Sequence, residues 1–65
     1  MKINILAFDI ALARSCLNMP QLAAKTGLPY QTIKNARAGK KVKTATVGKI
    51  ARALGVDVTE IMEVD

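Results

Sequence analysis

The chain has 65 residues and a formal net charge of +5, and 51% of its residues are hydrophobic. A chain of this length forms one small domain, which buries only about 60% of the surface exposed by its unfolded state. That leaves little room for a catalytic cleft. The chain has no histidine and one cysteine, Cys16, so an intrachain disulfide is excluded and a zinc site is disfavoured. We expect no metal, no cofactor, no small-molecule ligand and no enzymatic activity.

Basic residues are concentrated in the second half of the chain. Seven of the ten lie between positions 34 and 52, where no acid occurs: Lys34, Arg37, Lys40, Lys41, Lys43, Lys49 and Arg52. The five acids stand nearer the two ends: Asp9, Asp57, Glu60, Glu63 and Asp65. This separation predicts either one face directed at a polyanion such as nucleic acid or an ordinary solvated surface.

The N-terminal stretch, residues 1–13, is apolar but does not resemble a secretion signal. Asp9 interrupts it and no small-residue cleavage site follows. The stretch is also too short to span a membrane. We therefore expect a cytoplasmic protein without a membrane partner, in which Cys16 is a small buried side chain near a helix end.

The first predicted elements are a strand and a helix. Apolar and polar residues alternate over residues 2–6, as in a short strand that could pair with residues 62–64 at the other end of the chain. A helix is expected over residues 8–16, with Asp9 in its first turn. Its buried face would carry residues at helical spacing: Phe8, Ala11, Leu12 and Cys16.

The second helix is expected to begin after Asn18. Asn18 followed three residues later by Gln21 is typical of a capping box, and Pro20 is tolerated in a first turn. Leu22 and Ala23 would face the core. Gly27 is expected to end the helix in a left-handed conformation.

Three further helices are predicted after Gly27. The third covers about residues 29–38, buries Ile33 and Ala36, and ends at Gly39. After a basic loop at residues 40–43, Thr44 is expected to cap a fourth helix. Its buried stripe would be Val47, Ile50, Ala51 and Leu54, and Gly55 would close it. Asp57 and Glu60 predict a capping box for a last short helix carrying Val58, Ile61 and Met62.

The second and third helices have the pattern of a helix-turn-helix, at about residues 19–38. Two helices that meet at a steep angle need a small residue at the crossing, here Ala23, and a glycine turn, here Gly27. Leu28 and Ile33 would fill the angle from inside. The outer face of the second of these helices is then free to enter a DNA major groove.

At these residues the chain resembles the lambdoid phage repressor and Cro family of helix-turn-helix regulators. The resemblance extends from about residue 10 to residue 62. It rests on five short runs and their spacing: Asn18-Met19-Pro20-Gln21-Leu22-Ala23, Gly27-Leu28, Thr32-Ile33, Gly39-Lys40, and Lys49-Ile50-Ala51-Arg52-Ala53-Leu54-Gly55-Val56. It implies one domain over residues 1–65, an all-α, five-helix, lambda-repressor-like DNA-binding domain whose third helix reads DNA.

The resemblance also implies which residues contact DNA. Tyr30, Gln31 and Asn35 match the usual base-contacting positions, with Thr32 and Lys34 beside them. The loop residues Lys40, Lys41 and Lys43 match positions that contact the DNA backbone. The chemistry is suitable, because Gln31 and Asn35 lie one helical turn apart and a carboxamide can bond an adenine with both its groups. The alternative is that these are simply polar residues on an exposed helix.

Three positions depart from the family pattern. Met19 stands where the family often has a glutamine that holds a phosphate, so Gln21 or the backbone NH groups of that helix start would have to substitute. Pro29 stands where serine or threonine is favoured, which removes a capping side chain. Arg37 replaces a residue that is often acidic or aromatic, which adds positive charge near the groove and indicates a different phosphate contact.

The resulting interpretation is a sequence-specific double-stranded DNA-binding transcriptional regulator, a repressor, that binds as a homodimer. The expected association surface is the end of the chain away from the third helix, with Val56, Val58, Ile61, Met62 and Val64 and the edge of residues 3–6. The alternative for these residues is that they close the monomer's core. The alternative function is an antitoxin or protein-interaction module with the same fold.

Overall fold

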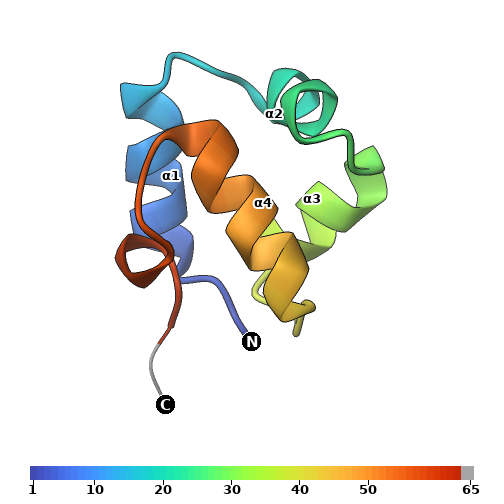
Figure 1. The fold of residues 1–65 in the computed structure, drawn as a ribbon, viewed down its shortest axis with the longest axis vertical. Helices are drawn as coiled ribbons and strands as arrows, with labels where there is room; N and C mark the ends of the chain where they lie inside the picture. The colour runs from blue at the N-terminus through green and yellow to red at the C-terminus, as the bar shows by residue number, and fades with distance from the viewer. Residues whose placement is uncertain (64–65) are drawn as a thin grey trace.

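The structure is a computed structural model and describes residues 1–63. Within them the fold is all-α, as Figure 1 shows. The elements are α1 (Ile5–Arg14), α2 (Met19–Thr26), α3 (Tyr30–Arg37), α4 (Thr44–Leu54) and the 3-10 turn η1 (Val58–Glu60). Five helices were expected, and the last of them is this single turn. No helix in the described part of the chain is long and apolar enough to cross a membrane.

The two ends of the chain meet, but they do not form the expected strands. The pairing is a single antiparallel bridge between Ile3 and Met62. Beside it the Asn4 NH donates to the Ile61 carbonyl at 2.7 Å and the Glu63 NH donates to the Lys2 carbonyl at 2.8 Å. The prediction for Val64 lies outside the described residues. The expected neighbourhood of the two ends is therefore correct, whereas the length of the pairing is not.

The first helix begins earlier than expected because Asn4 caps it. Its side-chain oxygen accepts from the Ala7 NH at 2.9 Å, so the helix starts at Ile5 rather than at Phe8. Asp9 consequently lies in the middle of α1 and not in its first turn. The expectation that Asp9 interacts with the positive end of the helix was wrong.

The expectation of a buried Cys16 was also wrong. The helix ends at Arg14, and Cys16 is exposed with a left-handed backbone, φ 57°. Ser15 explains why the chain turns here. Its hydroxyl donates to the carbonyls of Ala11 and Leu54, so the end of α1 is tied to the end of α4 instead of continuing.

The start of α4 also differs from the prediction. Thr44 is its first residue, and Lys43 occupies the capping position without a side-chain hydrogen bond. The capping box at Asp57 and Glu60 is present and organises η1. The NH and hydroxyl of Thr59 both bond the Asp57 carboxylate, and they lower the pKa of Asp57 below its usual value.

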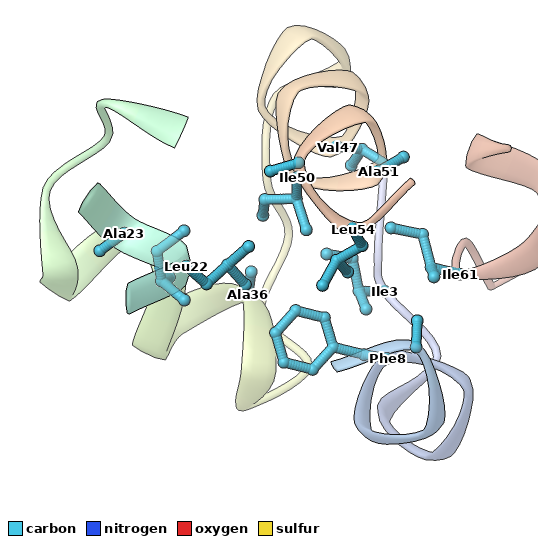
Figure 2. Packing of buried hydrophobic residues seen from close by; sticks show 13 residues of the cluster. Ile3, Phe8, Leu22, Ala23, Ala36, Val47, Ile50, Ala51, Leu54 and Ile61 are labelled. Carbon is cyan, nitrogen blue, oxygen red and sulfur yellow. The ribbon is translucent and has the colours of Figure 1, made fainter. Parts of the chain in front are cut away.

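The core is aliphatic apart from one ring and joins all four helices to the chain ends. Its fully buried large side chains are Phe8, Ile3, Leu22, Ile33, Ile50, Ile61 and Val47. In Figure 2 the Phe8 ring points from α1 towards Ala36 of α3 and Leu54 of α4. Every residue predicted for the inner faces of α2, α3 and α4 is buried.

The C-terminal apolar residues are divided between core and surface. Ile61 is completely buried, so it closes the monomer's core and was wrongly assigned to an association surface. Val56 and Met62 are half-buried, whereas Val58 is exposed. The alternative that these residues complete the core therefore holds for Ile61 and only in part for the others.

Candidate nucleic-acid interface

The turn between α2 and α3 sets the angle of α3. Gly27 ends α2 in the left-handed conformation, φ 75°, which side-chain-bearing residues rarely adopt. Thr26 stabilises the turn, because its hydroxyl donates to the Ala23 carbonyl at 2.9 Å and accepts from the Leu28 NH at 3.2 Å. Leu28 packs against the core behind the turn. α3 is thereby held across α2, as the helix-turn-helix pattern predicts.

The residues of α3 separate cleanly into an inner and an outer face. Ile33 and Ala36 are buried, and Pro29 precedes the helix without offering a side-chain cap. The outer face carries Tyr30, Gln31 and Lys34, all exposed. Polar side chains are therefore presented to solvent on a helix that is fixed from behind.

The outer face of α3 is organised by contacts between neighbouring turns. Gln31 Nε2 donates to Asn35 Oδ1 at 3.0 Å. Lys34 Nζ lies 5.7 Å from the centre of the Tyr30 ring, within the range of a cation–π contact. The predicted readers thus form two pairs, which reduces the side-chain freedom that binding would have to remove.

A groove of about 300 Å³ runs between α3 and the start of α4. It is lined by polar and basic side chains over an apolar floor: Leu28, Thr32, Asn35, Lys41, Val42, Lys43 and Thr46. Four of the predicted site residues from α3 and the loop therefore share one depression: Thr32, Asn35, Lys41 and Lys43. Lys40 is exposed just before it.

Met1 supports this basic loop, a contact that the sequence did not predict. The Met1 carbonyl accepts from the Val42 NH at 2.7 Å, and the Met1 amino group donates to the Val42 carbonyl at 3.0 Å. These two hydrogen bonds hold the loop in place. No side-chain pattern could have revealed this contact, because it is made by backbone groups 41 residues apart.

Gln21 is engaged at the start of α2. Its side-chain oxygen accepts from the Asn18 NH at 2.9 Å, and the Asn18 side chain accepts from the Gln21 NH at 2.8 Å. This is the predicted capping box. It occupies only the oxygen of the Gln21 carboxamide, whereas a phosphate would accept from the nitrogen, so capping and phosphate contact are compatible.

Arg37 has a protein partner that sequence reasoning missed. Its Nε lies 2.8 Å from Asp9 Oδ1, and its Nη2 donates to Asp9 Oδ2 at 2.9 Å. This bidentate ion pair joins the middle of α1 to the last turn of α3. The side chains remain 40% and 43% exposed, so the pair is screened by solvent.

The family comparison agrees with this geometry. A model of the Cro/C1-type HTH DNA-binding domain matches residues 2–65. The chain belongs to this family. No curated protein and no solved structure matches the chain significantly.

Membership of the Cro/C1-type family identifies the helix-turn-helix as a DNA-binding unit. In this Cro/C1-type domain, α3 presents Tyr30, Gln31 and Lys34 together, and the neighbouring groove gathers Thr32, Asn35 and two lysines. Gln21 and Arg37 stand apart from this group, each bound within the protein. The ion-pair partner of Arg37 had one visible signal in the sequence, since Asp9 is the single acid in the first half of the chain.

Proposed function

We propose that this Cro/C1-type domain is a sequence-specific transcriptional regulator, a repressor, that reads the major groove of double-stranded DNA with α3. The observation that carries the proposal is the outer face of α3, where Gln31 and Asn35 are aligned by a 3.0 Å hydrogen bond. Carboxamides on one helix face can make bidentate bonds to adenine N6 and N7.

Each residue group has a distinct role in this proposal. Gln31 and Asn35 read base edges, while Tyr30 packs on a thymine methyl or donates its hydroxyl, and Lys34 and Thr32 reach bases or phosphates. The backbone-contacting residues are Gln21, Arg37, Lys40, Lys41 and Lys43. Base contacts supply sequence preference and phosphate contacts supply most of the affinity.

Two copies are proposed to bind one operator. A single module of this kind covers only about 600–1,000 Å² of protein surface on DNA, which is small for selective binding. Two copies on half-sites about one helical turn apart double the contacts and the readout. This protein would therefore prefer a site with an inverted repeat.

The test is a titration of duplex DNA at several salt concentrations, on sites selected from a random duplex pool. If about six phosphates are neutralised, log K should fall with log salt at a slope of about −5. The selected sequences should converge on an inverted repeat. Absence of binding at low salt would overturn the proposal and favour the protein-interaction module.

A further inference from the structure

The outer surface of α1 is apolar although it is not covered by the rest of the chain. In this ten-residue helix only Asp9 and Arg14 carry charge. Its inner face buries Phe8, and the face about 160° away carries Leu6 and Ile10, one turn apart. These two side chains are 71% and 45% exposed. A helix that is apolar around most of its circumference is normally covered on both faces.

A groove lies directly beside this apolar face. It has a volume of about 220 Å³ and is lined by α1 and the segment of η1: Ala7, Ile10, Ala11, Arg14, Val56 and Glu60. Its walls are small or apolar, and only its Arg14 and Glu60 ends are charged. The groove has room for a leucine side chain, and Leu6 protrudes from the same helix next to it. One face therefore offers both a projecting side chain and a receptor for it.

A surface with a projection and a matching groove suits a second copy of itself. In a two-fold arrangement each copy inserts one side chain and receives one, so every contact is made twice. The charged ends of the groove are also self-complementary, because Arg14 of one copy can meet Glu60 of the other. A partner of unrelated sequence would not be expected to match all three features.

The distribution of charge also favours a second copy of this chain as the partner. Each copy carries a net charge of +5, so two copies repel when their basic sides meet. On the α1–η1 side Glu60 lines the groove, and Asp57 and Glu63 belong to the same C-terminal segment. Polyanions are drawn instead to the α3 side. In Figure 1, α1 and α3 stand on opposite sides of α4, so a contact through the outer face of α1 leaves α3 uncovered.

We propose that two copies of this chain associate through the outer face of α1, with Leu6 of each copy entering the α1–η1 groove of the other. The inference rests on the two-copy binding of the proposed function and names its surface, which shares Leu6 and Val56 with the surface expected from the sequence but is centred on α1. A contact built on one short helix falls at the small end of specific interfaces, so association is weak and concentration-dependent.

The test is sedimentation equilibrium of the 65-residue chain without DNA, from about 1 μM to 1 mM, the range of weak association. Leu6→Glu is compared with Ala24→Glu, which makes the same charge change at an exposed position of α2. Burial of one leucine contributes about tenfold or more in affinity, and a two-fold dimer buries two of them, one from each copy. Leu6→Glu should raise the dimer dissociation constant at least about 100-fold, and Ala24→Glu should leave it near that of the unaltered chain.

Two outcomes would overturn the inference. One is an unaltered chain that stays monomeric at the highest concentration, and the other is a dimer that Leu6→Glu does not weaken. Amide chemical shifts of the unaltered chain, followed with concentration, provide a readout that needs no variant. They should move at Ala7, Ile10 and Arg14 and not at Gln31. Because no DNA is present, a failure here leaves DNA binding by α3 to be judged separately.

Discussion

The two outer helices, α1 and α3, are alike on the inside and opposite on the outside. Each buries one large side chain and an alanine three positions later, Phe8 with Ala11 in α1 and Ile33 with Ala36 in α3. Both pairs belong to the same core. The outward residues differ, since α1 shows aliphatic side chains and α3 shows carboxamide, phenol and ammonium groups.

In both helices the inward residues build the fold, and the outward residues determine what the domain can bind. The inward residues of α1 and α3 are interchangeable in kind, because a core requires only apolar side chains at helical spacing that fill the space. The outward residues decide what each side can bind. We therefore expect substitutions at inward positions to affect both sides together, and those at outward positions to affect one side alone.

The largest effect is expected from Phe8→Ala, which removes the shared core. Truncation of a buried phenylalanine costs about 3–5 kcal/mol, comparable with the whole stability of a small domain. Urea unfolding followed by circular dichroism should show a largely unfolded chain. Leu6→Ala, on the exposed face of the same helix, is the matched control and should unfold near the unaltered chain. Similar midpoints for the two variants would contradict the division into inward and outward positions.

The second prediction compares the two ends of α4. Lys43 precedes its first turn and Arg52 lies in its last, about 14 Å apart along the axis. Lys43→Ala should weaken binding to all duplexes and reduce the salt slope by about 1. Arg52→Ala, the control, removes the same charge far from the α3 groove and should leave the slope unchanged. Equal slopes for the two variants would show that net charge, and not the position of the basic loop, governs binding.

The smallest effect is expected at the ion pair that joins the two helices. Asp9→Asn removes the partner of Arg37 and should lower the free energy of unfolding by about 0.2–1 kcal/mol, because the pair is partly exposed. Without this competing carboxylate the Arg37 guanidinium can neutralise its phosphate more completely, so the salt slope should steepen slightly. Arg37→Gln removes the same ion pair without leaving a free guanidinium, so it should not steepen the salt slope. If both variants give the same slope, Arg37 does not contact DNA in the way proposed.

Much of the fold could be predicted because its signals are local. Asn18 with Gln21, the glycines after α2 and α4, and the apolar spacing of α4 each act within a few residues, and all are found as predicted. The predictions were wrong where a residue distant in the sequence determines the local structure. Cys16 was expected to be buried by its spacing from Phe8, but Ser15 is tied to Leu54 and ends the helix first.

The candidate site shows the same difference between local signals, which could be predicted, and contacts between distant residues. The candidate readers Tyr30, Gln31 and Asn35 lie on one helix, so they could be proposed in advance from the family resemblance and, for Gln31 and Asn35, from helical spacing. The support of Val42 by Met1 could not be predicted, because it joins backbone groups far apart in the sequence. The pairing of Arg37 with Asp9 also joins distant residues, and its one signal was that Asp9 is the single acid in the first half of the chain. Which side of the molecule each charge reaches is determined by packing rather than by its place in the chain.

We propose that α3 reads bases while the basic loop only anchors the DNA. The most direct measurement is the ratio of dissociation constants for a selected site and a scrambled duplex, determined for the unaltered chain and for Gln31→Ala. Gln31→Ala should lose about 1–3 kcal/mol on the selected site and relax preference at one base pair. Its affinity for the scrambled duplex should stay unchanged. An equal loss on both duplexes would contradict base reading by α3.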